Sequence, residues 1–367
     1  MRIVAPDYYP TFRCKAAKCR RACCEGWPVT ISMADYFRLL GIKASSDTKD
    51  RLDRALHFTE YPTEDEYAMI LPRYDGKCTM HMDNGLCAIH AEAGEEALPA
   101  VCRLYPRGLR EGEISCANSC EAVIELLYRT NPLVFRNMEI PISFKAPPRI
   151  HFFETGGRET EIRLWLIGIV QDRRIALASR LNRLGQAVCH MDDALTAHDH
   201  KRIDELLAGA DFPAAMPDPD KEKALHIIRT LLCRLDERSD SIRAYGQLAL
   251  EQFEQDDDPG QTQARFIDTC PIWETWFENM IVNHMFFAQF PFQDRPVSLR
   301  EEVAALFSVY SLLRFMMTGA GDGTINRLID IAAALFRLVD HTAFDQYAAA
   351  VLKEICMPDD IALLLVV

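Results

Sequence analysis

Residues 14–27 read CKAAKCRRACCEGW, which places four cysteines within eleven positions. A loop that returns four thiols so quickly is typical of a site for a soft metal ion or an iron–sulfur cluster, because one short turn supplies several ligands. Lys15, Lys18, Arg20 and Arg21 lie between these thiols. Their charge would favour thiolate over thiol and offset the negative charge of a thiolate-bound centre. The stretch predicts a compact N-terminal domain built around a metal site.

Most of the cysteines lie in the N-terminal part of the chain. Nine of the thirteen cysteines precede residue 121, and we predict all nine as metal ligands: Cys14, Cys19, Cys23, Cys24, Cys78, Cys87, Cys102, Cys116 and Cys120. No secretory signal opens the chain, so we expect a reducing cytoplasmic location, where clustered cysteines bind metals rather than form disulfides. Spacing alone leaves zinc and an iron–sulfur cluster open. The other four, which we interpret as buried apolar side chains, are Cys189, Cys233, Cys270 and Cys356.

Charge divides the 367 residues unevenly. Residues 1–150 hold 20 of the 41 Lys and Arg and 20 of the 54 Asp and Glu, so residues 151–367 hold 21 against 34 and carry the whole net charge of −13. An acidic C-terminal part argues against nucleic acid as a partner, because phosphate backbones require a basic face. Its longest strongly apolar stretches, 281–292 and 361–367, are too short or too interrupted to span a bilayer, so we expect no membrane partner.

Hydrophobic spacing predicts a mainly α protein with two domains, a small cysteine-rich irregular or helical domain at 1–150 and an acidic helical bundle at 151–367 that could bind a substrate or partner. We place the boundary in the extended, proline-broken segment 137–151. Short helices are expected at 33–40, 49–58, 94–103 and 117–130. Longer ones are expected at 161–195, 220–236, 240–254, 263–288, 298–317, 323–338 and 341–356.

Two motifs of the C-terminal part have simple structural interpretations. Gly319, Gly321 and Gly323 are more consistent with a helix–helix turn than with a nucleotide-binding glycine loop, because no alternation of strands and helices surrounds them. The aromatic residues between Trp273 and Phe292 recur at helical spacing and are predicted to be core.

The cysteine motifs resemble those of the flagellin lysine-N-methylases, a family related to small proteins with a C-x2–4-C-x2–3-C-C motif described as zinc- or iron-chelating. The matching residues run in one order across roughly residues 5–135: Cys14-x4-Cys19-x3-Cys23-Cys24-x-Gly26-Trp27, Gly85-Leu86-Cys87-Ala88-Ile89-His90, Gly94-Glu95-Glu96-x-Leu98, Cys102-Arg103-x-Tyr105-Pro106-Arg107, Ser115-Cys116, Glu121-Ala122 and Asn131-Pro132. The resemblance implies a four-iron, four-sulfur cluster and methyl transfer from S-adenosylmethionine to lysines of flagellin. One family cysteine corresponds to either Cys116 or Cys120.

The same motifs supply candidates for contacting the methyl donor or the lysine amine. We predict Glu25 and Tyr105 as catalytic residues, and Trp27, Arg103 and Arg107 as donor-binding residues; Trp27 could place its ring against a sulfonium. Three of these have a plainer alternative: a turn cap for Glu25, and packing alone for the rings of Trp27 and Tyr105. His90 has ligand spacing relative to Cys87, but related chelating proteins carry Tyr there, which implies a packing role.

A second function remains open at this point. The cysteines could hold zinc or iron structurally in a non-catalytic metal-binding or redox protein whose helices bind a partner, and a structural zinc site needs four thiolates per ion with no open position. Colour separates the two, since an iron–sulfur protein purified without oxygen is brown and a zinc protein is colourless.

Overall fold

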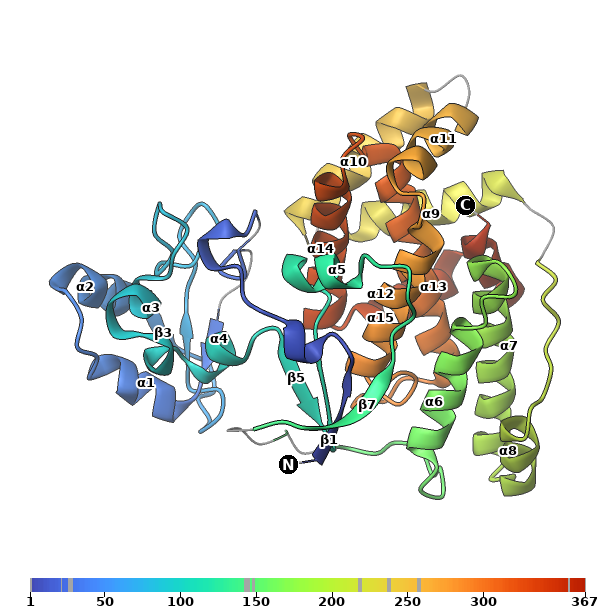
Figure 1. Ribbon diagram of the computed structural model, residues 1–367, viewed down its shortest axis with the longest axis horizontal. Coiled ribbons are helices and arrows are strands. Elements are labelled where there is room, and N and C mark those ends of the chain that lie inside the picture. Colours follow the sequence, from blue (N-terminus) through green and yellow to red (C-terminus); the bar gives the residue numbers. More distant parts are fainter. Residues whose placement is uncertain are drawn as a thin grey trace. The chain divides into compact units, whose positions relative to one another are not determined.

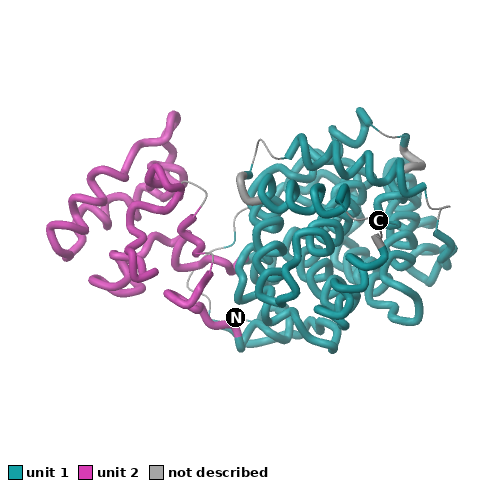
Figure 2. Tube along the Cα trace, turned by 90° about the horizontal axis from the view of Figure 1, so that it is seen from above, with its two compact units in different colours: residues 1–11, 109–367 teal, residues 12–108 magenta. Residues whose placement is uncertain are grey.

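The computed structural model describes residues 2–20, 22–25, 29–141, 146, 149–216, 220–235, 239–255, 259–355 and 357–366. Trp27 and Cys356 therefore lie outside the described residues. The chain forms two compact units, shown in Figure 2: Phe12–Gly108, which we call the cysteine-rich unit, and Met1–Thr11 together with Leu109–Val367, which we call the helical unit. The expected boundary at residue 150 does not coincide with either junction, because residues 109–141 pack with the helices.

The cysteine-rich unit is built from short elements. These are η2 (Ala16–Lys18), β2 (Val29–Ile31), α1 (Met33–Leu40), α2 (Ser46–Ala55), β3 (Leu56–Phe58), β4 (Ala68–Ile70), α3 (Ala88–Ala93), η3 (Glu95–Ala97) and α4 (Ala100–Leu104). Its antiparallel sheet has the order β2-β4-β3. Ser32 and Ser45 begin α1 and α2 as N-caps, each accepting a hydrogen bond from a backbone N–H three residues on, which satisfies a donor that the helix leaves free.

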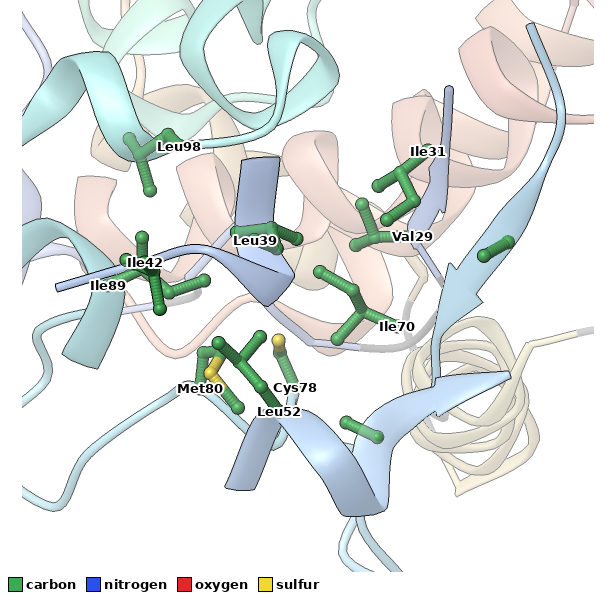
Figure 3. Close-up of a cluster of buried hydrophobic side chains, with 12 residues drawn as sticks. Val29, Ile31, Leu39, Ile42, Leu52, Ile70, Cys78, Met80, Ile89 and Leu98 are labelled. Atoms are coloured by element: carbon green, nitrogen blue, oxygen red, sulfur yellow. The ribbon is translucent and has the colours of Figure 1, made fainter. Parts of the chain in front are cut away.

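An apolar cluster holds these short elements together (Figure 3). Its buried side chains come from both strands and helices: Val29, Ile31, Leu39, Ile42, Leu52, Ala55, Ala68, Ile70, Cys78, Met80, Ile89 and Leu98. Cys78 belongs to this core, and Cys24, Cys87 and Cys102 pack against it. The thiols thus lie on a rigid base.

The helical unit includes a four-stranded sheet and a large set of helices (Figure 1). The sheet has the order β5-β6-β1-β7, with β1 (Arg2–Pro6) parallel to β6 (Glu113–Cys116) and antiparallel to β7 (Phe135–Glu139). Strand β5 is Arg107–Arg110, and the unit begins within it, at Leu109. The other elements are η1 (Tyr9–Thr11), α5 (Glu121–Leu127), α6 (Glu159–Val170), α7 (Leu177–Thr196), α8 (His200–Leu207), α9 (Lys221–Leu235), α10 (Asp240–Gln255), α11 (Pro259–Thr269), α12 (Trp273–Phe287), α13 (Leu299–Ala320), α14 (Ile325–His341), α15 (Phe344–Ile355) and η5 (Pro358–Leu365).

Helix α13 is the centre of this unit and contacts α7, α10, α14 and α15. A capping box at Ser298 and Glu301 fixes its start. Among the described residues it is the one helix long and apolar enough to cross a membrane, but 83% of its most apolar window is buried inside the protein. This is the pattern of a core helix, because a helix that is apolar all round needs cover on every side.

The mainly α fold class is confirmed, and so are most of the predicted helices, including Met33–Leu40. The single helices predicted at 161–195 and 263–288 are each wrong, because each is two helices. Asp172 accepts hydrogen bonds from the backbone and guanidinium of Arg174 and forms the turn between α6 and α7, which run side by side in Figure 1. Pro271 separates α11 from α12, since proline disfavours helical backbone in the residue before it.

Three other predicted helices differ in extent. Pro99 separates η3 from α4 within 94–103, the helix predicted at 117–130 begins only at Glu121, and that at 49–58 ends at Ala55 because strand β3 follows. The glycine motif is confirmed as a helix–helix turn: Gly319 lies in α13, Gly323 has φ +83°, and Thr324 caps α14. The core assignment of the aromatic run is confirmed for most of its members, with Trp276, Phe277 and Phe286 almost fully buried.

Candidate functional site

Seven of the predicted ligands lie in the cysteine-rich unit, and backbone contacts connect the segments that carry them. Cys23 and Cys24 form a turn just before Glu25, and Cys78 forms an isolated β-bridge with Pro72. The backbone N–H of Cys78 donates a hydrogen bond of 2.6 Å to the carbonyl oxygen of Cys24. This bond joins the second cysteine motif to the first.

Two short helices position the next thiols. Cys87 is the N-cap residue of α3, and Cys102 lies inside α4. The buried carboxylate of Asp35 in α1 accepts a hydrogen bond of 2.9 Å from the backbone N–H of Ala100, which holds the first turn of α4 in place. Arg38 of the same helix donates a hydrogen bond of 2.7 Å to the carbonyl oxygen of Leu98, so two side chains of α1 position the segment that carries Cys102.

The first cysteine loop also packs closely against the chain that precedes Cys87. Cys14 and Cys19 flank η2, which contains Ala17. Gly85 has φ +80°, and a Cβ atom there would lie 3.3 Å from both the Cα and the carbonyl oxygen of Ala17. Glycine is needed at this position both for its left-handed backbone and for the close approach.

Electrostatic coupling shows that five thiols lie near one another. Cys23 Sγ and Cys24 Sγ are 3.9 Å apart. This contact with Cys23 is the largest cause of the raised pKa of Cys24, followed by burial and by the charges of Cys23, Cys78 and Cys87. Burial raises the pKa of Cys102 most, and the charges of the same three residues raise it further. The first two motifs and α4 thus converge on one region.

Burial makes this group of thiols costly to ionise. It raises the pKa of Cys78 to about 11 and also raises the pKa of Cys87. Each thiolate that forms raises the pKa of its neighbours, since like charges disfavour the charged form. A bound cation would reverse this balance, because a coordinating thiol is deprotonated by its metal.

The chemistry of this group fits a thiolate-bound metal centre. Several soft sulfur donors lie together, which is the ligand type that zinc and iron–sulfur centres select. Within the described ranges, no three Cys, His, Asp or Glu side chains already stand in the arrangement of a metal site. Ligation would therefore require the sulfurs to move closer together.

Cys116 and Cys120 belong to the helical unit rather than to the unit of the other seven. Cys116 ends β6 and is buried; its backbone N–H donates to the hydroxyl of Tyr8 at 3.2 Å, and its carbonyl accepts from Asn283 at 2.8 Å. Cys120 is the N-cap residue of α5. Their assignment as ligands stays a prediction.

The residues predicted to contact donor or amine have local partners in the same unit. Glu25 forms a β-bridge and a 3.7 Å ion pair with Lys77. Arg103 pairs with Glu96 at 2.9 Å, and the guanidinium of Arg107 lies over the Phe12 ring at 5.0 Å. Tyr105 ends α4. The roles of these residues in contacting donor or amine stay predictions. His90 is exposed on α3.

The cysteines interpreted as apolar core differ in burial. Cys270 is buried as predicted, and burial raises its pKa to about 12. Cys189 is half-buried, whereas Cys233 is exposed on α9, so the core interpretation is wrong for Cys233. Its side chain lies on the solvent face of an amphipathic helix.

Sequence reasoning missed a cavity in the helical unit. Glu302 of α13 and Asp345 of α15 line it, together with His284 and Asp340, whose Nδ1 and Oδ1 atoms are hydrogen-bonded at 2.9 Å. Glu302 is only 2% exposed. The sequence signal for this cavity was Glu302, an acidic residue within the apolar pattern of α13. Glutamate side chains are almost never fully buried unless they are paired.

Comparison with known proteins gives one family model and two curated relatives. A model of the FliB lysine N-methylase C-terminal domain matches residues 163–365, which lie within the helical unit. Curated lysine-N-methylases of Salmonella typhimurium (strain LT2) and Salmonella choleraesuis (strain SC-B67) are each 27% identical over 107 residues, which is 29% of this chain. The match spans about a quarter (26%) of each relative's length. No solved structure matches the chain.

Proposed function

Because this chain belongs to the FliB lysine N-methylase family, whose domain model matches more than half of its residues, we propose that it methylates lysine side chains of a protein substrate. The matched curated relatives carry the name lysine-N-methylase. Flagellin is the proposed substrate and the cytoplasm the proposed location, as the resemblance of the cysteine motifs implies.

The proposed methyl donor is S-adenosylmethionine, and the proposed metal cofactor is an iron–sulfur cluster of the four-iron, four-sulfur type. The observation that carries the metal proposal is the convergence of Cys23, Cys24, Cys78, Cys87 and Cys102. These thiols would hold the cluster, which when bound supplies a redox-active iron centre, and the donor supplies the methyl group.

The chain's own residues would have three tasks in this reaction. Lys15, Lys18 and Arg20 would offset the negative charge of the bound thiolates. The core beneath Cys78 would keep water from one side of the centre. The protein must also receive a lysine and release its proton, since only the neutral amine is a nucleophile and its ordinary pKa is about 10.4.

Mass spectrometry of flagellin tests the activity directly. Protein purified without oxygen should add methyl groups to flagellin lysines when S-adenosylmethionine is supplied, and it should contain iron and acid-labile sulfide. An absence of methylation together with zinc as the bound metal would favour the non-catalytic metal-binding function instead.

A matched pair of cysteine variants tests the metal site. Cys24→Ser should lose iron, colour and methylation together, because it removes one of the converging thiols. Cys233→Ser should keep all three, because Cys233 is exposed on α9 in the other unit. If Cys24→Ser lost colour but still methylated flagellin, the metal would have a purely structural role.

A further inference from the structure

Four aromatic rings of the cysteine-rich unit contact one another at the edge of its apolar core. They belong to Tyr36 and Phe37 of α1, Phe58 of β3 and Tyr67, which directly precedes β4. Neighbouring ring centroids lie from 5.3 Å apart, for Tyr36 and Tyr67, to 6.0 Å apart, for Phe37 and Tyr67. These separations are typical of aromatic pairs. Each ring thus holds the next in place, and the group is a rigid surface.

Much of this group faces solvent. Phe37 and Phe58 are each 57% exposed, while the two tyrosine rings are half-buried against the core. Leu40, one turn after Phe37 on α1, is 52% exposed. Single exposed apolar side chains are ordinary, but a contiguous group bordered by polar residues is typical of an interaction site. We call the four rings and Leu40 the aromatic face.

An acidic loop borders the aromatic face. The loop is 59–66, between β3 and β4, and its exposed carboxylates are Glu60, Glu64, Asp65 and Glu66. No Lys or Arg occurs between Ala55 and Pro72. Within the described part of the chain, none of the four carboxylates takes part in an ion pair. The cation nearest in sequence to the rings, Arg38, is already paired with Asp35. The negative charge of the loop is therefore not compensated.

Backbone hydrogen bonds fix this loop beside the rings. The hydroxyl of Thr59 donates to the carbonyl oxygen of Glu66 at 2.8 Å, which closes the loop. The backbone N–H of Met33, at the start of α1, donates to the carbonyl oxygen of Glu64 at 2.8 Å. Both bonds use the carbonyl groups of the glutamates, so the carboxylates stay available to a partner.

The combination of exposed rings and uncompensated carboxylates favours a cationic partner. The face of an aromatic ring attracts an ammonium group, and a surface of one charge sign attracts the opposite sign. One ammonium meets only one or two rings, whereas this surface extends over a helix, a strand and a loop. The matching partner is therefore a polypeptide segment that presents several cationic side chains together with apolar ones.

Charge argues against the other possible occupants of this surface. The cysteine-rich unit holds 14 Lys and Arg and 14 Asp and Glu, which leaves 27 against 40 in the helical unit, so that unit carries the whole net charge of −13. The acidic loop would repel it. A second copy would set the same loop against itself, and nucleic acids and anionic bilayers are repelled for the same reason.

We propose that the aromatic face and its acidic loop dock a lysine-bearing segment of the protein substrate, through lysines other than the one that is methylated. The inference rests on the proposed lysine methylation, because a substrate of that reaction necessarily presents lysine ammonium groups. It gives the cysteine-rich unit a second task besides metal binding, which is to hold the substrate.

Binding of a synthetic peptide tests the surface without any methylation. A labelled peptide of alternating lysine and leucine, blocked at both ends, should bind the full-length protein saturably in fluorescence anisotropy. The same peptide with glutamate in place of lysine should not bind. Phe37→Ala combined with Phe58→Ala should weaken binding by about tenfold, the loss of two cation–π contacts. Phe152→Ala removes a ring that is 44% exposed in the helical unit and should bind like the wild type. Equal binding of both peptides, or unchanged binding by the double variant, would overturn the proposal.

A second pair of variants leaves the rings in place. Glu64→Gln combined with Glu66→Gln keeps the carbonyl groups that hold the loop and should weaken peptide binding by about threefold to tenfold. Glu205→Gln combined with Glu251→Gln removes two exposed carboxylates of the helical unit, on α8 and α10, and should not weaken it. Equal weakening in both pairs would mean that the peptide responds only to the net charge of the chain, which contradicts the proposal.

Methylation kinetics separate a failure of this proposal from a failure of the proposed function. With flagellin as substrate, Phe37→Ala combined with Phe58→Ala should raise KM by about tenfold more than it changes kcat, because a docking contact is kept throughout the reaction. If the wild type methylates flagellin and the double variant has an unchanged KM, the docking assignment fails while the function stands. If the peptide binds through the aromatic face and no lysine of flagellin is methylated, the proposed function fails while the surface stands. A wild-type dimer that the double variant converts to a monomer in sedimentation would assign the face to a second copy and overturn the proposal.

Discussion

Cys78 and Cys24 are joined through their backbones, the N–H of the first donating to the carbonyl of the second at 2.6 Å. The bond places Cys78, which is buried in the core, beside the Cys23–Cys24 doublet of the first loop. Within that doublet, Cys24 is half-buried and Cys23 is exposed. A metal centre built here would have one ligand anchored in the apolar core and others on loops. The geometry of the loops should therefore control metal binding without controlling the fold of the whole chain.

Replacing Gly85 by alanine tests this control of the loops. The new Cβ would lie 3.3 Å from the backbone of Ala17, so the first cysteine loop would have to shift away from Cys87. We expect Gly85→Ala to lower the iron and sulfide content of the purified protein. Gly76→Ala is the matched control, because Gly76 has φ +77° and its Cβ would meet nothing within 4 Å. Equal metal loss in both variants would trace the effect to backbone strain rather than to the Ala17 contact.

Removing the buried charge of Glu278 should be among the most destabilising single changes in the helical unit. Glu278 is fully buried in α12, and it accepts hydrogen bonds from Arg173 at 2.8 Å and from Arg180 at 2.5 Å. Glu278→Gln would remove the counter-charge of Arg173 and leave Arg180 with only the more distant carboxylate of Glu274, at 3.9 Å. Breaking a buried pair in this way typically costs about 3–5 kcal/mol of unfolding free energy. Urea unfolding followed by circular dichroism measures the loss.

An exposed pair nearby serves as the control for that measurement. Arg174 is 86% exposed and pairs with Asp172 in the turn after α6. Arg174→Ala should change the unfolding free energy by no more than about 1 kcal/mol, as is usual for surface pairs. A similar loss in both variants would contradict a special role for Glu278.

Two glycine-to-alanine substitutions in helices should have opposite effects on stability. Gly319 of α13 lies against α10, whereas Gly168 of α6 has open space beside it. A Cβ at Gly319 would lie 2.7 Å from the backbone Cα of Ala249, so Gly319→Ala must push the two helices apart and should cost about 1–3 kcal/mol. Gly168 in α6 has open space at its Cβ, so Gly168→Ala should stabilise the protein by about 0.5–1 kcal/mol. Thermal unfolding of both variants gives the comparison, and a stabilised Gly319→Ala would show that the helices can separate freely.

The helices were largely predictable from the sequence, while the sheets and the grouping of the thiols were not. Amphipathic spacing places α1, α9 and α14 close to their observed bounds because local periodicity determines which face is buried. Strands of three residues, such as β2, carry too little pattern to stand out. The break after α6 depends on hydrogen bonds of Asp172, which no hydrophobic pattern encodes.

Tertiary contacts explain what remained hidden at the candidate sites. Cysteine spacing identifies donors, but only the fold brings Cys102 near Cys23 and assigns Cys116 to the other unit. The cavity of the helical unit brings together Glu302 and Asp345, which lie on different helices. Each would be interpreted as a surface carboxylate if its helix were considered alone, since most acidic residues of helices are solvated.

The raised pKa of Glu302 makes a signed prediction for stability against pH. Its unfolded pKa is about 4.3, and burial, followed by the charge of Asp345, raises the pKa in the folded state. The folded protein then holds the proton more tightly than the unfolded chain, so its contribution is fully present below pH of about 4.3 and falls as pH rises toward the folded pKa. Glutamine does not titrate, so Glu302→Gln removes the loss of stability that the wild type shows as pH rises. The stability of the variant relative to the wild type should therefore rise with pH, by at most about 1.4 kcal/mol per pH unit. Urea unfolding at several pH values between about 4.5 and 8 measures it, and Glu205→Gln should follow the wild type throughout. A difference between Glu302→Gln and wild type that stays constant across this range would mean that Glu302 is ionised in the folded protein at every pH tested.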